Sequence, residues 1–176
     1  MRYATYRLGL LCGLLALVLA WQSGCAIPRH IWKQDDIATA TLNDASSDDR
    51  VLIASGKSDF KQAVIERLKD RYTEGSIFVR FVGLSSLRDE QANDYDAVVI
   101  MTSCVAWGID PRAQDFLKRY KDADNVIVLV TSGDGGWLPD TKGKLYDAIS
   151  SASKQTRVAE VADEIAAKVD ALLENH

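Results

Sequence analysis

An uninterrupted apolar run at residues 97–101, Ala-Val-Val-Ile-Met, is the feature that most constrains the fold of this chain. Residues 126–130 form a second run of this kind, and residues 51–54 form a shorter one. A strand that is apolar at every position is covered on both faces, as the strands of parallel sheets are. Segments with helical periodicity alternate with these runs. This alternation predicts an α/β fold, an open, doubly wound parallel sheet with a layer of helices on each face.

Two further strands are predicted from weaker signals. Residues 77–82 are apolar except for Arg80, which favours a place at the edge of the sheet. Residues 147–153 are rich in alanine and serine and form the weakest candidate. The last helix has the clearest pattern in the chain, because apolar residues recur at helical spacing from residue 157 to about residue 173.

Capping residues mark the ends of the two earlier helices. Ser58 is a good N-cap for a helix that begins at Asp59, and Gly75 is expected to end that helix as a left-handed cap residue. Asp110 is expected to cap the next helix. Pro111 follows at the first helical position, where the missing N–H removes no hydrogen bond.

Residues 1–24 have the pattern of an export signal. Arg2 and Arg7 precede an apolar stretch at residues 8–21, which is shorter than the roughly 20 residues that a bilayer-spanning helix needs. Small residues directly precede Cys25, and the sequence Ser-Gly-Cys resembles the lipobox of bacterial lipoproteins. The resemblance implies cleavage before Cys25 and lipidation of this residue, including palmitate. Ordinary cleavage nearby and an uncleaved membrane anchor are the alternatives.

The expected product is a lipoprotein held in the lipid bilayer of the bacterial cell envelope. Ala26 follows the lipidated cysteine, and by resemblance to lipoprotein sorting in Gram-negative bacteria it favours the outer membrane, facing the periplasm. Residues 25–49 are polar and lack a sustained period, so we interpret them as a tether. Residues 50–176 then form the globular domain.

Charge and composition exclude several functions. Without Arg2 and Arg7, 19 of the 21 basic residues remain against 25 acidic residues, a net charge of −6 that disfavours nucleic acid. The two histidines, His30 and His176, lie in the predicted tether and at the last position. A Ser-His-Asp or Cys-His mechanism and a zinc site are therefore not expected. We interpret Cys104 as a small buried residue at a strand end.

The segment from residue 95 to residue 120 resembles the third strand, loop and helix of flavodoxin-like proteins, with Trp107-Gly108 and Pro111 as the matching elements. The Gly-rich stretch 131–137 is similar to the loop that follows the family's fourth strand. The resemblance implies the strand order 2-1-3-4-5 and non-covalent binding of FMN. The implied function is electron transfer or reduction of a small acceptor such as a quinone, as in an FMN-dependent oxidoreductase.

The resemblance also assigns residues to the cofactor, although no catalytic residue and no metal ligand is assigned. Trp107 and Trp137 would flank the flavin ring. The phosphate would lie in the loop after the first strand, and further contacts would come from the loops after the third and fourth strands. These additional candidates are Ser55, Gly56, Lys57, Ser58, Thr102, Ser103, Gly108, Gly133 and Asp134.

Other interpretations of the same residues remain open. Trp107 could simply pack its loop, and Asp134 could stabilise a turn rich in glycine. Asp59, in the first turn of the following helix, would repel a phosphate. The alternative function is therefore a binding or assembly module without a cofactor, which meets a protein partner at the bacterial envelope.

Overall fold

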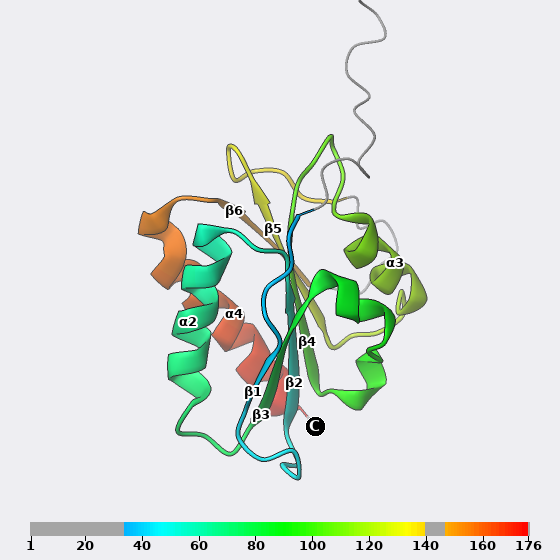
Figure 1. Ribbon diagram of the computed structural model, residues 1–176, viewed down its shortest axis with the longest axis vertical. Helices are drawn as coiled ribbons and strands as arrows, with labels where there is room; N and C mark the ends of the chain where they lie inside the picture. Colours follow the sequence, from blue (N-terminus) through cyan, green and yellow to red (C-terminus); the bar gives the residue numbers. More distant parts are fainter. Residues whose placement is uncertain (1–33, 140–146, 176) are drawn as a thin grey trace, which may run out of the picture.

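The computed structural model describes residues 34–139 and 147–175, and these residues form a three-layer α/β/α sandwich (Figure 1). One six-stranded sheet lies in the middle, with the strand order β1-β3-β2-β4-β5-β6. The strands are β1 (Ala40–Leu42), β2 (Arg50–Ser55), β3 (Phe78–Gly83), β4 (Ala97–Ser103), β5 (Val126–Ser132) and β6 (Asp147–Ala152).

The predicted sheet is confirmed. Strands β3, β2, β4, β5 and β6 pair in parallel in this order, which is the predicted 2-1-3-4-5 arrangement. The register sets Ile53 beside Val99 and Val99 beside Ile127, so the three apolar runs form the centre of the sheet. The weakest predicted strand, β6, pairs along its whole length with β5.

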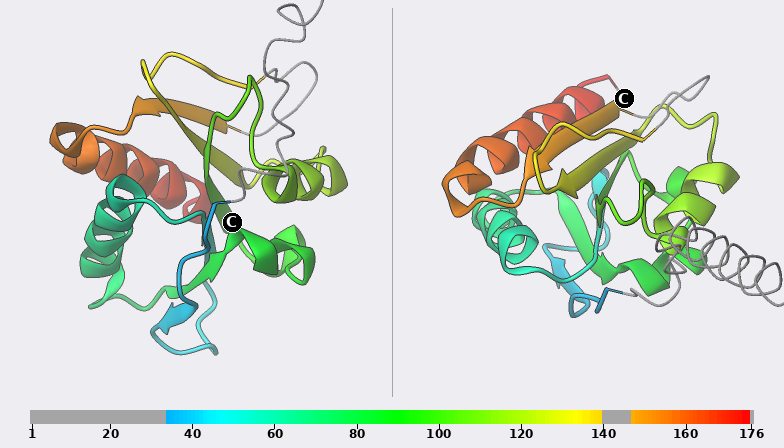
Figure 2. Two further views of the ribbon diagram at one scale, coloured as in Figure 1. Left: turned by 45° about the horizontal axis from the view of Figure 1, so that its top comes forward. Right: turned by 90° about the horizontal axis from the view of Figure 1, so that it is seen from above.

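Helices cover both faces of the sheet (Figure 2). Helices α2 (Asp59–Tyr72) and α4 (Val158–Leu173) pack on one face. The other face is covered by α3 (Pro111–Arg119) and by two 3-10 helices, η1 (Leu84–Arg88) and η2 (Ala92–Asp94). A third 3-10 turn, η3 (Gln155–Arg157), leads into α4.

Each central strand contributes to two separate cores. In β2, Val51 and Ile53 face the core under α2 and α4, whereas Leu52 and Ala54 face the core under α3 and η1. All four side chains are fully buried. The absence of polar alternation in the sequence is thus explained by burial on both faces.

The caps were predicted correctly at three positions. The Ser58 hydroxyl accepts a hydrogen bond from the Lys61 amide at 3.2 Å, and the Asp110 carboxylate accepts one from the Arg112 amide at 2.9 Å. Pro111 occupies the first turn of α3. The prediction for Gly75 was wrong, because α2 ends at Tyr72 and Thr73, with ordinary right-handed angles, is its C-cap.

The predicted tether is corrected for residues 34–49, which pack against the domain. Strand β1 pairs antiparallel with β3, so β3 and Arg80 are not at the edge of the sheet. The Asn43 side chain donates to the carbonyls of Tyr72 and Ile77 at 2.8 and 2.7 Å. A strand of three residues is too short to produce a recognisable period, and this is why the sequence pattern missed it.

The signal segment 1–24, the lipidation site Cys25 and the tether residues 25–33 lie outside the described residues. Within residues 34–139 and 147–175, no helix is both long and apolar enough to cross a bilayer.

Candidate functional site

The carboxyl ends of the parallel strands meet at one edge of the sheet, at the top of Figure 1. The loops after β2, β4 and β5 leave from this edge, and they contain most of the predicted site residues. A hydrogen bond of 2.9 Å between the Ser103 and Thr131 hydroxyls joins the ends of β4 and β5. The structure therefore brings these loops together, as predicted for a parallel sheet.

A short N-terminal segment, Gln34–Asp36, lies across the ends of β2 and β3, and we call it the strap. Asp36 forms a β-bridge with Gly56, and the Lys57 amide donates to the Asp35 carbonyl at 2.6 Å. Two glycines make room for the strap. A Cβ on Gly56 would lie 2.7 Å from the Gln34 Oε1, and a Cβ on Gly83 would lie 2.3 Å from the Asp36 Cβ.

Lys61 of α2 anchors the strap, although a lysine in an amphipathic helix is ordinarily expected on the solvent side. The side chain is in fact fully buried. Its Nζ donates to the Gln34 Oε1 at 2.9 Å and to the Ser103 Oγ at 2.8 Å. Burial lowers the pKa of Lys61 to about 8, although the nearby Asp110 charge acts in the opposite direction.

Arg112 holds the strap from the other side of the sheet. Its guanidinium makes two hydrogen bonds to the Asp110 carboxylate, at 2.9 and 2.8 Å. It also donates to the Asp36 carboxylate at 2.8 Å, the Ser85 hydroxyl at 2.9 Å and the Gln34 carbonyl at 3.0 Å. Burial would raise the pKa of Asp110, but the hydrogen bonds and charge of Arg112 hold it below the usual value. This cluster joins distant segments, so no local sequence signal marks it.

The loop after β2 is a poor fit for the phosphate of FMN, because both of its hydroxyls and the amides of Gly56 and Lys57 have partners within the chain. The Lys57 amide is bonded to the strap, and the Ser58 hydroxyl caps α2. The Ser55 hydroxyl is buried and donates to the Gly56 carbonyl at 2.8 Å. Asp59 occupies the first turn of α2, where its charge opposes an anion. The contacts of Ser55, Gly56 and Ser58 therefore do not support their assignment to a phosphate, whereas the Lys57 side chain is exposed and its contacts do not decide the question.

The loop after β4 ends in a tight turn that exposes Trp107. Val105 and Gly108 exchange backbone hydrogen bonds of 2.7 and 3.1 Å around it. Ala106 and Trp107 both have positive φ angles, 47° and 60°, as the two central residues of a type I′ turn do. This conformation is uncommon for a bulky residue and costs about 1–3 kcal/mol. Trp107 is nevertheless 83% exposed, so packing against its own domain does not explain it.

The loop after β5 is a glycine turn stabilised by Asp134. The Asp134 carboxylate accepts from the Gly136 amide at 3.1 Å and the Ser132 hydroxyl at 3.0 Å, and these bonds lower the pKa of Asp134. Gly135 has a φ of 77°, and a Cβ there would lie 2.4 Å from the Ala152 amide nitrogen. Asp134 therefore organises the turn, in agreement with the alternative interpretation from sequence.

An open pocket of about 530 Å³ lies between the loops after β4 and β5. Trp107 and the half-buried Trp137, the two residues expected to flank a flavin ring, both line it. Three other candidates from the end of β4 and its loop do not. Thr102 is fully buried under the loop, Gly108 is buried in the turn, and the Ser103 hydroxyl is bonded to Lys61 and Thr131. The remaining lining residues are Cys104, Ser132, Gly133, Asp134 and Gly136.

Metal chemistry has no support in the described part of the chain. Residues 34–139 and 147–175 contain no cluster of histidine, cysteine and carboxylate side chains that could hold a metal ion.

No protein-family model matches the sequence, and no curated protein matches it. Among solved structures, a mutant of the flavo di-iron protein from Thermotoga maritima is similar with a TM-score of 0.47 and 16% identity. The match covers 74% of this chain and 37% of that protein. FerB, a flavoenzyme NAD(P)H:(acceptor) oxidoreductase from Paracoccus denitrificans, is similar with a TM-score of 0.41 and 14% identity, over 72% of this chain and 98% of FerB.

The strand order and the two helical layers define the class of protein independently of these matches. The chain has an open, doubly wound α/β fold with the strand order of flavodoxin-like proteins. A fold of this class supports many activities, so the function has to be argued from the site.

Proposed function

We propose that this protein is a flavodoxin-like binding module that works without a cofactor and contacts a protein partner through its exposed loops. The observation that carries this proposal is Trp107, which is 83% exposed at the tip of a strained turn. Tryptophan is enriched among the few residues that contribute most of the energy of protein interfaces. A fixed turn also holds the side chain in place before binding, which lowers the entropy lost on association.

The shape of the pocket favours a protein partner over a small ligand. Small-molecule sites usually bury most of the ligand's surface between their walls. Here Trp107, Gly133, Asp134 and Gly136 line a pocket that is open to solvent. An open apolar hollow beside a protruding tryptophan suits the side chains of a second protein.

The strap supports the same proposal. In flavodoxin-like proteins the loop after the first parallel strand is the place for the FMN phosphate. In this chain the strap covers that loop, with Asp36 bridged to Gly56 and Lys61 bonded to Gln34. The strap thus occupies backbone groups of this loop that would otherwise be available to a phosphate.

We further propose that Cys25 carries the lipid anchor, so that the partner is a protein of the bacterial envelope. Metabolic labelling with a palmitate analogue tests the anchor. The expected result is a labelled full-length protein and an unlabelled Cys25→Ser variant. Equal labelling of both proteins would refute lipidation at this residue.

FMN-dependent electron transfer is the second candidate function, and the position of the pocket favours it. Trp107 and Trp137 line a hollow of about 530 Å³ at the carboxyl ends of β4 and β5, where this fold class places its ligands. A flavin ring would stack on these indoles, and bound flavin would supply one- and two-electron chemistry. Its phosphate would need partners outside the loop after β2.

Flavin titration separates the two functions. Tryptophan and flavin fluorescence are followed while the purified protein is mixed with FMN and, separately, with riboflavin, which lacks the phosphate. The binding-module proposal predicts no saturable quenching by either compound. Stoichiometric retention of FMN, bound about tenfold or more tightly than riboflavin, would overturn it, because a working phosphate site would then exist.

Photo-crosslinking in intact cells tests the partner directly. A photoreactive residue replaces Trp107 in one full-length variant and the exposed Lys121, near the end of α3, in the control. The proposal predicts one discrete crosslinked protein at position 107 and none at position 121. A purified complex with that protein should then weaken by about thirtyfold or more in the Trp107→Ala variant. Identical crosslinks at both positions would contradict the proposal.

A further inference from the structure

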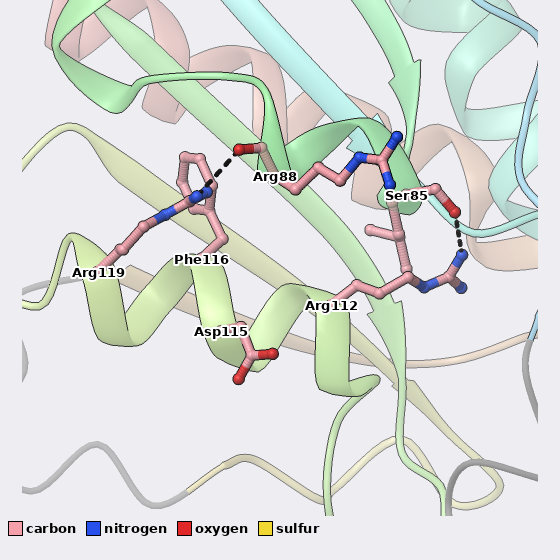
Figure 3. Close-up of a pocket in the computed structure, with 7 residues that line it drawn as sticks. Ser85, Arg88, Arg112, Asp115, Phe116 and Arg119 are labelled. Carbon is pink, nitrogen blue, oxygen red and sulfur yellow. Dashed lines mark hydrogen bonds between the residues drawn. The ribbon is translucent and has the colours of Figure 1, made fainter.

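A second cavity, of about 460 Å³, lies between η1 and α3 and belongs to neither loop of the site above. Leu84 and Phe116 form an apolar floor, and both side chains are fully buried in the core beneath. Figure 3 shows Ser85 and Arg88 on η1 facing Arg112 and Arg119 on α3, whereas the Asp115 side chain points away from η1 in this view. We call this cavity the arginine cleft, because three guanidinium groups surround its apolar floor.

Arg112 forms a wall of the cleft and is unavailable to a ligand. Its Nε and both of its terminal nitrogens donate to Asp110, Asp36, Ser85 and Gln34. These five bonds use every N–H of the guanidinium. Its charge is also balanced by two carboxylates.

Arg119 is held in place with hydrogen-bonding capacity to spare. Its two terminal nitrogens donate to the carbonyls of Arg88 and Leu87, at 3.0 and 2.5 Å (Figure 3 draws the first). The guanidinium also lies over the rings of Phe116 and Tyr120, 5.4 Å from each centroid. Among the described residues no carboxylate pairs with it, so its charge is not neutralised and its other N–H groups are unused.

Arg88 and Asp115 complete the rim of the cleft. Arg88 is paired with Asp89 at 3.1 Å, but both side chains are more than 70% exposed, and such a surface pair contributes little. Asp115 contributes a negative charge on the α3 side and is 3.7 Å from Lys118. The rim therefore attracts one negative charge at Arg119 and Arg88 and repels a second one near Asp115.

We propose that the arginine cleft binds a monocarboxylate attached to an apolar group. The carboxylate accepts hydrogen bonds from the fixed Arg119, a planar donor whose geometry matches a carboxylate. The apolar group lies over Leu84 and Phe116. Asp115 favours this singly charged ligand over a phosphate monoester, which carries nearly two charges at neutral pH. The source is either a free small acid or the carboxylate of a peptide chain, because both present the same chemistry.

Binding of benzoate to the full-length protein tests the proposal. The probes are benzoate, the uncharged benzamide of the same shape, and phenyl phosphate, and amide chemical shifts are followed by NMR. The expected result is that benzoate shifts the amides of η1 and α3, with benzamide and phenyl phosphate about tenfold weaker or more. Equal affinity for benzoate and benzamide would overturn the proposal, and so would the absence of any localised shift.

Three variants locate the ligand. Arg119→Gln should abolish benzoate binding, but it also removes the bonds that hold η1. Arg88→Gln is the second test, because its exposed side chain is not needed for folding, and it should weaken binding severalfold. Lys121→Gln, just beyond the end of α3 and not lining the cleft, is the control for net charge. A loss in Lys121→Gln equal to that in Arg88→Gln would refute a specific site.

A hexapeptide with an aromatic C-terminal residue, compared with its C-terminal amide, distinguishes the two sources. If the free-acid peptide binds and the amide does not, the cleft accepts chain termini. If benzoate binds and neither peptide does, the ligand is a small acid. Both results support the monocarboxylate proposal, whereas equal binding of the two peptides contradicts it.

Discussion

The two faces of the sheet are built differently. One face is covered by α2 and α4, which have 14 and 16 residues. The other is covered by α3, with 9 residues, and by η1 and η2, with 5 and 3. The arginine cleft opens between the short elements of the second face. We expect the long helices to hold their places more firmly than the short elements, which have fewer residues anchored in the core.

The largest expected effect compares a core residue from each face. Ile165 of α4 and Leu87 of η1 are both buried. We expect Ile165→Ala to lower the free energy of unfolding by about 4 kcal/mol and Leu87→Ala by about 2 kcal/mol, because the short η1 can move into the space that is left. Urea denaturation measures both values. If both variants lose the same free energy of unfolding, the two faces are equally rigid, contrary to this expectation.

The strap provides the next largest effect. A Cβ at Gly83 would lie 2.3 Å from the Asp36 Cβ, close to the backbone, whereas one at Gly56 would meet the end of the Gln34 side chain at 2.7 Å. Since a side-chain end can rotate away, we expect Gly83→Ala to destabilise the domain by about 3 kcal/mol and Gly56→Ala by about 1 kcal/mol. The same urea series measures both variants. Equal and small losses would show that the strap is not tightly docked.

The pH dependence of stability tests the buried Lys61. Burial lowers its pKa from 10.5 to about 8, so between these values the unfolded chain binds more protons than the folded one. Stability should therefore rise with pH, by about 2 kcal/mol from pH 8 to pH 10. Urea denaturation at the two pH values should show this rise, and the Lys61→Met variant should lack it.

Two tyrosines set the upper pH limit of this experiment. Burial raises the pKa of Tyr72 and of Tyr95 above the ordinary value of 10.0. Above that value the unfolded chain loses these phenol protons while the folded chain keeps them, so stability falls as the pH rises further. The stabilities of the parent protein and of the Lys61→Met variant are therefore compared only up to pH 10.

The smallest expected effect concerns the exposed turn. Trp107 is at the second central position of the type I′ turn and has a φ of 60°. Replacing it by glycine removes the backbone strain of this positive φ, because glycine has no Cβ. We expect Trp107→Gly to raise the free energy of unfolding by about 1 kcal/mol while it abolishes partner binding. Trp137→Ala is the contrasting variant, because Trp137 packs against the second core and its loss should destabilise the domain. A Trp107→Gly variant that is less stable than the parent protein would mean that Trp107 serves the fold.

The sequence by itself determined the sheet and the main helix caps. The runs at residues 97–101 and 126–130 predict buried central strands, and Ser58 and Asp110 mark the starts of α2 and α3. These features are visible because burial and capping depend on residue types at short, regular spacing. The same reasoning located Trp107 in the loop at the end of β4.

Only the tertiary structure decided how the carboxyl ends of the strands are covered. The Gln34 side chain donates to Ser103, which is 69 positions away in the sequence, and Arg112 pairs with Asp36 across 76 positions. Lys61 is buried because these groups surround it. Such contacts have no period or local motif, since they depend on which segments the finished sheet brings together. For this reason the sequence predicted a phosphate loop where the fold has placed its own strap.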